Sequence, residues 1–128
     1  MNESTFTRGI HKLLPPEIYA YKTSDRFSAG VPDAWYSGLG GDLWIEYKIV
    51  KEERVSIKPN LSKLQVLWLR RRYLEGRNVA VAVGTTKGVL IYQHLAWESS
   101  QETSKAISKI AFTKWIIDQC SQSTTSPP

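Results

Sequence analysis

The stretch that decides the fold is residues 30–49, with the sequence GVPDAWYSGLGGDLWIEYKI. Two runs rich in aromatic and β-branched side chains flank a turn that contains three glycines, which is typical of a β-hairpin. Side chains of a strand point alternately to its two faces. We therefore expect Trp44, Glu46 and Lys48 on one face of the second strand, and the apolar residues between them on the other.

A pair of carboxylates is expected at one end of this hairpin. Asp33 starts the first strand directly after Pro32, which cannot donate to a sheet ladder and so marks the edge of the strand. Pairing across the hairpin can bring Asp33 beside Glu46, and Lys48 follows about 6.6 Å further along the same strand. Two converging carboxylates repel each other unless they share a cation, and hard oxygen ligands suit Mg²⁺ or Mn²⁺. A Glu and a Lys two residues apart are also typical of a solvated ion pair on a strand surface.

The regions on either side of the hairpin extend the pattern to a mixed α/β fold. Helical periodicity, proline and glycine stops, and short apolar runs predict helices over 4–14, 61–75 and 103–119 and further strands over 18–22, 78–83 and 89–92. The order is helix, three strands, helix, two strands, helix, which favours a central sheet with helices packed on it. We expect one domain over residues 1–120 and a disordered tail over 121–128.

Composition limits the classes of protein and of site. The chain has 128 residues, of which 41% are hydrophobic, enough for the core of one domain. One cysteine and two histidines argue against an internal disulfide, a cysteine-rich zinc site and a histidine-built metal centre. Residues 1–5 lack the features of a signal peptide, and no apolar run is long enough to span a bilayer. We therefore expect a protein of the cytoplasm that has no membrane partner.

The basic charge is concentrated in one segment. Residues 51–77 contain eight basic and three acidic residues, which accounts for the whole net charge of +5. Such a segment suits a polyanion such as DNA or RNA, although a solvated helix with spare arginines looks similar. Residues 70–72 are three consecutive arginines, which spread around a helix, so at most two of them can face one groove. The residues expected to bind a DNA strand are Lys51, Arg54, Lys58, Lys63 and Arg70.

These motifs resemble a known family. Pro32-Asp33 followed by Glu46-Tyr47-Lys48 resembles the signature of the PD-(D/E)XK nuclease superfamily, whose members share a restriction-endonuclease-like core of helix, three strands, helix and strand. Together with Leu61-Ser62-Lys63-Leu64-Gln65, Trp68-Leu69 and Gly76, it is most similar to the VRR-NUC and phage Holliday-junction-resolvase branch. The resemblance covers roughly residues 3 to 92.

The resemblance implies roles for the residues of the hairpin. Asp33 and Glu46 would bind the metal, with the backbone carbonyl of Tyr47 assisting. Lys48 would act at the scissile phosphate or on its attacking water.

Two further residues have alternative interpretations. Gln65 falls where this branch has a helix glutamine near the active site, but with Ser62 it also fits a helix capping box. Relatives often place another acidic residue on the first helix, and Glu3 is the better candidate because Glu17 lies beyond the prolines. Glu3 could equally serve only the helix dipole.

The function expected on this basis is a Mg²⁺-dependent DNA endonuclease, structure-selective like a Holliday-junction resolvase and associated with a phage or mobile element. A homing or restriction-type endonuclease, or a non-catalytic nucleic-acid-binding module on the same fold, remains open. Cutting both strands in a coordinated way calls for two sites, so we expect a homodimer or larger symmetric assembly, with the last helix around Trp115 and Ile116 as a contact surface. The expected location is the cytoplasm of a bacterium or phage-infected host cell.

Overall fold

The predicted helices and strands follow each other in the predicted order, and two short strands are added to them. The computed structural model describes residues 1–23 and 30–121. Its elements are α1 (Glu3–Leu13), β1 (Tyr19–Lys22), β2 (Ala34–Gly38), β3 (Gly41–Ile49), β4 (Ser56–Ile57), α2 (Lys63–Leu74), β5 (Val79–Thr85), β6 (Gly88–Tyr92), β7 (Gln101–Glu102) and α3 (Lys109–Cys120), with short 3₁₀ turns η1 (Ala96–Glu98) and η2 (Thr103–Lys105).

Five of the strands form one mixed sheet in the order β1-β2-β3-β5-β6. β3 and β5 run parallel, and α2 connects them, whereas the other neighbouring strands are antiparallel. The predicted hairpin is β2–β3, in which Ala34 pairs with Ile45. The prediction of a central mixed sheet flanked by helices is therefore confirmed.

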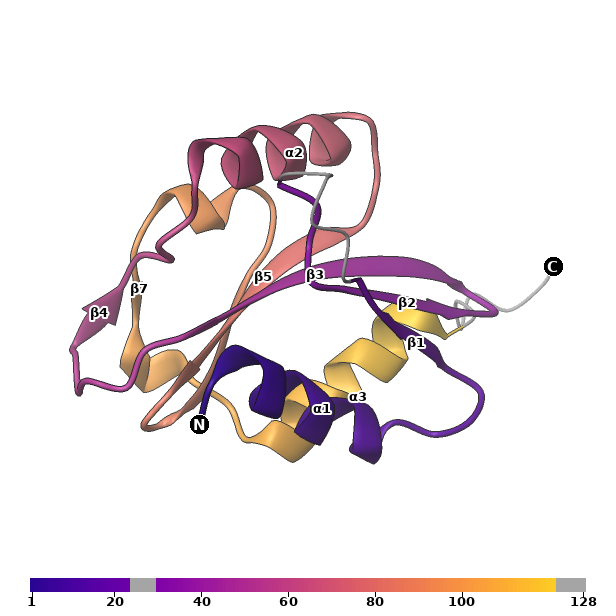
Figure 1. Ribbon diagram of the computed structural model, residues 1–128, viewed down its shortest axis with the longest axis horizontal. Coiled ribbons are helices and arrows are strands. Elements are labelled where there is room, and N and C mark those ends of the chain that lie inside the picture. Colours follow the sequence, from indigo (N-terminus) through magenta and orange to yellow (C-terminus); the bar gives the residue numbers. More distant parts are fainter. Residues whose placement is uncertain (24–29, 122–128) are drawn as a thin grey trace, which may run out of the picture.

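The sheet has a helical layer on each face. α2 lies on one face, and α1 and α3 lie on the other (Figure 1). The apolar side of β3, including Leu43 and Tyr47, packs with α1 and with Phe112 of α3. On the opposite face, Leu69 of α2 packs with the valines of β5 and with Trp97. β5 is buried along nearly its whole length because both of its faces are covered.

The last helix is shorter than the sequence predicts. It begins at Lys109 instead of Thr103, with Ser108 as its N-cap, whose side chain accepts a hydrogen bond from the Ala111 amide at 3.0 Å. Residues before this cap are used elsewhere: Ile107 bridges to Val89 of β6, and β7 pairs with β4 in a two-stranded sheet that the sequence did not reveal. The helix prediction over 103–108 is wrong because these residues join β pairings and a 3₁₀ turn.

The predicted contact surface around Trp115 and Ile116 is corrected at Ile116. Ile116 is fully buried in the core under the sheet, and the ring of Trp115 stacks on Phe112 with 5.8 Å between centroids. A side chain with no exposed area cannot contact a second subunit. Ile116 therefore packs on its own sheet, whereas Trp115 is partly exposed and a subunit contact through it stays a prediction.

The disordered tail expected over 121–128 lies outside the described residues except for Ser121. Within the described ranges, no helix combines the length and the apolar character required to cross a membrane.

Candidate active site

The β2–β3 register brings the predicted carboxylates together. Ala34 pairs with Ile45, so the next position outward sets Asp33 beside Glu46. The Asp33 side chain accepts a hydrogen bond from the Tyr47 amide at 3.0 Å, and its backbone carbonyl accepts one from the Thr23 amide at 2.8 Å. Asp33 is thus fixed between the ends of β1 and β3.

Glu46 is an acidic side chain inside the protein. It is only 3% exposed. Its Oε2 accepts a hydrogen bond from Gln65 Nε2 at 2.8 Å and lies 3.6 Å from Lys48 Nζ. Its Oε1 is buried and has no hydrogen-bond partner among the described residues. A buried carboxylate oxygen without a donor is costly, so this atom is available to a ligand.

The protonation of Glu46 reflects this environment. Burial, followed by the negative charge of Asp33, raises the pKa of Glu46 to about 8, although the Lys48 ammonium opposes the shift. At neutral pH the side chain therefore holds a proton unless a positive charge replaces it. A divalent cation would supply that charge, and the pair of carboxylates offers the hard oxygen ligands that Mg²⁺ and Mn²⁺ prefer. The residues present therefore fit such a cation.

Gln65 both completes the capping box and contacts Glu46, and its part in catalysis stays a prediction. Ser62 caps α2 by accepting a hydrogen bond from the Gln65 amide at 3.1 Å, and Gln65 Oε1 accepts one from the Ser62 amide at 2.9 Å. Because the side-chain oxygen is held by the cap, the side-chain NH₂ group points at Glu46. The capping box therefore fixes the orientation of the amide that contacts the buried carboxylate.

Gly30 keeps the chain that leads to Asp33 close to this capping box. Its φ is +89°, and a Cβ at this position would lie 2.5 Å from the carbonyl oxygen of Leu64. Only glycine fits both the positive φ and the close approach. The segment before Asp33 is thereby packed against the first turn of α2, which carries Gln65.

A hydrogen-bonded chain behind the site was missed in the sequence. On the core side of β3, the Tyr47 hydroxyl lies 2.6 Å from the Tyr36 hydroxyl, which lies 2.8 Å from His11 Nε2. Burial raises the pKa of both tyrosines and lowers the pKa of His11, so neutral side chains are favoured. Strand alternation could have placed both tyrosines on the core face, but nothing local indicated that His11 of α1 would reach them. The chain links α1 to the strand that carries Glu46.

Glu3 is not brought to the carboxylate pair. It is exposed at the start of α1. The described residues contain no group of three or more Asp, Glu, His or Cys side chains that could share an ion. The geometry therefore gives Glu3 no contact with a cation held by Asp33 and Glu46, and its catalytic role stays a prediction.

The predicted DNA-binding residues are exposed but differ in their surroundings. Lys58 and Lys63 are exposed just before and at the start of α2. Arg54 Nη2 lies 3.9 Å from a Glu52 carboxylate oxygen, and Arg70 Nη1 lies 3.2 Å from one of Glu98. The Arg70 side chain therefore points towards η1, whereas Lys58 and Lys63 flank the segment that leads to Gln65.

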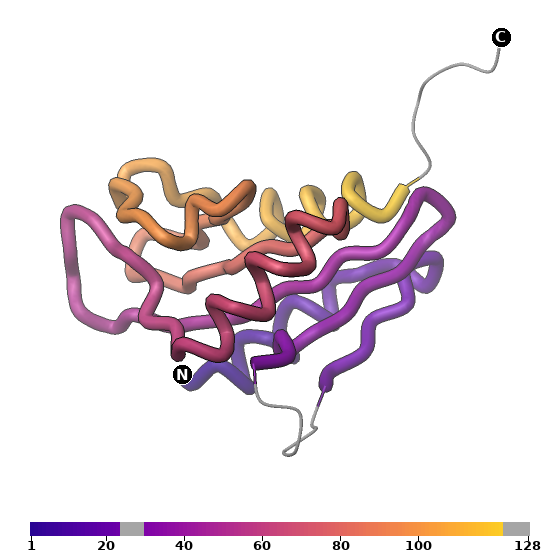
Figure 2. The backbone as a smooth tube through the Cα atoms, turned by 90° about the horizontal axis from the view of Figure 1, so that it is seen from above, coloured from indigo at the N-terminus to yellow at the C-terminus, as the bar shows by residue number. Residues whose placement is uncertain are grey.

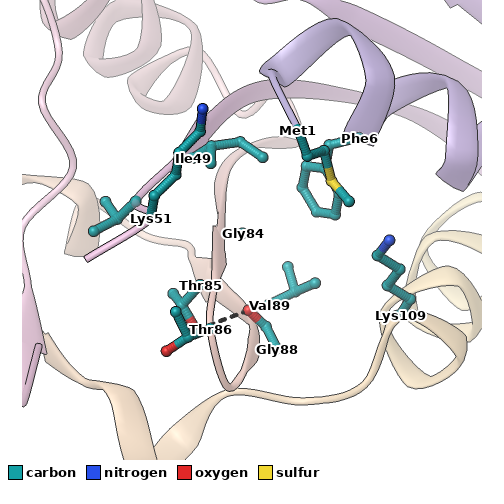
Figure 3. Close-up of a pocket in the computed structure, with 11 residues that line it drawn as sticks. Met1, Phe6, Ile49, Lys51, Gly84, Thr85, Thr86, Gly88, Val89 and Lys109 are labelled. Atoms are coloured by element: carbon teal, nitrogen blue, oxygen red, sulfur yellow. Dashed lines mark hydrogen bonds between the residues drawn. The ribbon is translucent and has the colours of Figure 1, made fainter. Parts of the chain in front are cut away.

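Lys51 lies at a pocket beyond the end of β3. The pocket has a volume of about 280 Å³ and is lined by apolar side chains with Lys51 and Lys109 on opposite sides (Figure 3). The Lys109 Nζ is 5.7 Å from the centre of the Phe6 ring. Phe6 belongs to the core on the α1 and α3 side, so this pocket opens on the side of the sheet away from Glu46.

Comparison with known proteins identifies a similar fold. No family model and no curated protein matches the sequence. Among solved structures, the chain is similar to Hjc, a Holliday junction resolvase from the archaeal hyperthermophile Archaeoglobus fulgidus, with a TM-score of 0.57 and 16% sequence identity. The similarity covers 87% of this chain and 96% of that protein. An identity of this size shows the fold alone, and the predicted restriction-endonuclease-like core is confirmed.

Proposed function

We propose that this chain is a metal-dependent DNA endonuclease that selects branched DNA, like a Holliday-junction resolvase of the VRR-NUC and phage type. The observation that carries the proposal is the buried Glu46 carboxylate, which has one oxygen without a partner and lies beside Asp33, Lys48 and Gln65. A purely structural ion pair has no need for a second carboxylate or for an oxygen left without a donor.

The proposed metal ligands are Asp33, Glu46 and the backbone carbonyl of Tyr47, and the proposed ion is Mg²⁺ or Mn²⁺. When bound, the cation supplies Lewis acidity that lowers the pKa of a water and neutralises charge on a phosphate. Asp33 is held in place for this role by the Tyr47 amide. Gln65 keeps Glu46 in one orientation through its hydrogen bond to Oε2.

Lys48 is the residue proposed to contact the substrate phosphate. Its side chain is 23% exposed, while that of Glu46 is 4% exposed, so the ammonium lies at the opening above the buried carboxylate. There it can donate to a phosphate oxygen and stabilise charge that develops during cleavage. It also reduces the repulsion between the two carboxylates.

The nature of the substrate follows from charge and fold. The exposed basic residues of segment 51–77 suit a polyanion, and the similar solved structure is described as a Holliday junction resolvase. Residues 1–23 and 30–121 carry one such site, so a coordinated cut of both strands calls for a homodimer. We place the protein in the cytoplasm of a bacterium or phage-infected cell, where such DNA occurs.

The proposal is tested with a panel of labelled DNAs: duplex, single-stranded, flapped and four-way-junction DNA, each with Mg²⁺, Mn²⁺ or EDTA. Wild type is compared with Asp33→Asn and with the matched control Asp118→Asn, an exposed aspartate on α3. We expect metal-dependent cutting of branched DNA by wild type and Asp118→Asn, and at least a hundredfold loss in Asp33→Asn. Binding without cutting of any DNA would refute the nuclease and leave a binding module.

A further inference from the structure

Five aromatic rings form a continuous row across one face of the molecule. We call Tyr19, Tyr21, Trp35, Trp44 and Trp68 the aromatic row. The rings of Tyr19 and Tyr21 are stacked with 6.5 Å between centroids, and Tyr19 meets Trp35 edge to face at 5.6 Å. Trp35 stacks on Trp44 at 6.0 Å, and Trp44 meets Trp68 of α2 at 5.5 Å. Each ring touches the next, so the row spans β1, β2, β3 and α2.

The aromatic row lies on the same face of the sheet as the candidate active site. Tyr21 pairs with Trp35, and Trp35 pairs with Trp44, so the three residues form one line across the strands. Asp33 lies two residues before Trp35, and Glu46 lies two residues after Trp44, so the carboxylate pair forms a parallel line across the hairpin. Two residues of a strand span about 6.6 Å, so the row begins at the edge of the carboxylate pair.

Helix α2 leaves part of this row uncovered. Figure 2 looks onto the α2 face and shows the helix crossing β3 and β5, with β1 and β2 lying beside it. Tyr19 is 56% exposed and Tyr21 is 48% exposed, while Trp35 and Trp44 are partly exposed. Adjacent exposed aromatic residues of this kind are typical of a binding surface.

Cationic groups accompany the aromatic row. The Arg72 guanidinium lies 5.8 Å above the ring of Trp68, although it also pairs with Glu75 at 3.3 Å. Arg77 lines a polar pocket of about 540 Å³ together with Trp44 and Asp42. Rings flanked by arginines suit bases joined by phosphates, because bases stack on the rings and phosphates pair with the cations.

We propose that the aromatic row binds unpaired bases of the DNA strand next to the phosphate that is cut. The inference rests on the proposed nuclease function and specifies its substrate class as DNA with unstacked nucleotides beside the cleavage point, such as a flap or a branch. Bases inside a uniform duplex are already stacked on their neighbours and present no free face to these rings. Unpaired bases present a free face to the rings, and stacking of bases on aromatic rings depends little on the base sequence.

The test measures binding without cleavage, by fluorescence anisotropy in EDTA, for labelled oligothymidylate, flapped DNA and blunt duplex. The variant is Tyr19→Ser with Tyr21→Ser, which alters the two most exposed rings, and the matched control is Ile110→Ser, a 75% exposed apolar residue on α3. We expect the double variant to bind oligothymidylate and flapped DNA about tenfold or more weakly, with duplex binding changed less than twofold. The control should bind all three DNAs like wild type.

A second measurement does not depend on the folding of any variant. Wild type is irradiated with oligonucleotides that carry 5-iododeoxyuridine, which crosslinks to aromatic side chains that contact it, and the crosslinked residues are mapped by mass spectrometry. Crosslinks at Tyr19, Tyr21 or Trp35 support the proposal, and crosslinks only elsewhere overturn it.

Other results of the binding test also overturn the inference. Unchanged binding, or an equal loss for all three DNAs, would exclude selective stacking. A wild-type dimer that becomes a monomer in the double variant, by sedimentation, would show that the face joins two copies of the chain. Failure of the nuclease proposal is recognised separately, because it is read from cleavage by wild type and Asp33→Asn, whereas this inference is read from binding without metal.

Discussion

Replacing Glu46 by glutamine should stabilise the metal-free protein at alkaline pH. Folding raises the pKa of Glu46 from 4.5 to about 8, so the folded chain holds this proton more tightly than the unfolded chain. Below pH 4.5 the group is protonated in both states and stability is unaffected. Between pH 4.5 and 8 stability falls as pH rises, and above pH 8 the whole loss is present. Glutamine carries no charge at any of these pH values and so avoids the loss.

The size of the effect follows from the same values. At about 1.4 kcal/mol per pH unit, the interval from 4.5 to about 8 corresponds to at most about 5 kcal/mol. Water that enters the site when Glu46 ionises reduces this, so we expect between about 2 and 5 kcal/mol. The Gln65 amide can still donate to a side-chain oxygen at position 46, so the variant keeps that contact.

The assay is urea unfolding followed by circular dichroism at pH 5, 7 and 9 in EDTA. As the pH rises from 5 to 9, the free energy of unfolding of wild type should fall relative to that of Glu46→Gln. Mg²⁺ in place of EDTA should restore the free energy of unfolding of wild type and leave that of Glu46→Gln unchanged. Parallel stability curves for the two proteins across this pH range would refute the reasoning, because they would mean that Glu46 is ionised without cost in the folded chain.

Three further predictions concern the metal, the capping box and the approach to α2. Because Glu46 must lose its proton to bind a cation, the Kd for Mg²⁺ measured by calorimetry should fall about tenfold from pH 6 to 7 and about fivefold from pH 7 to 8. A Kd that does not change with pH would exclude this coupling. Ser62→Ala should lower the free energy of unfolding by about 1 kcal/mol with little change in the cleavage rate. Gln65→Ala should lower both the free energy of unfolding and the cleavage rate, as urea unfolding and single-turnover cleavage would show. Equal cleavage rates in wild type and Gln65→Ala would remove Gln65 from the site. Gly30→Ala should destabilise the chain by about 2 kcal/mol or more. The control Gly9→Ala should not, because this helix position has no neighbour within 4 Å. Equal urea midpoints for the two variants would show that the contact of residue 30 with α2 relaxes.

The hairpin and its faces could be predicted because they depend on local sequence. Alternation in β3 assigned Tyr47 to the core and Glu46 to the opposite face, and the turn length set the register that brings Asp33 to Glu46. The capping-box pattern also located the start of α2 to within two residues. The hairpin is determined within residues 30–49, and the capping box is determined within residues 62–65.

The features that were missed depend on contacts between distant segments. The last helix loses its first turns because the Thr103 amide donates to the Val55 carbonyl and because Ile107 pairs with Val89, and neither partner is visible from helical periodicity. His11 reaches Tyr36 only because α1 packs under the sheet. The sequence presented the capping box and a contact near the carboxylates as alternatives for Gln65, but one side chain makes both contacts because its oxygen and nitrogen face different partners.

The central claim is that Asp33 and Glu46 hold a divalent cation that DNA cleavage requires. The most direct measurement is the single-turnover rate of cutting a labelled four-way junction across a titration of MgCl₂, for wild type, Asp33→Asn and Asp118→Asn at pH 8. We predict a rate that rises and saturates with Mg²⁺ in wild type and Asp118→Asn, with at least a hundredfold loss in Asp33→Asn. Equal rates in wild type and Asp33→Asn, or cutting that persists in EDTA, would contradict the account.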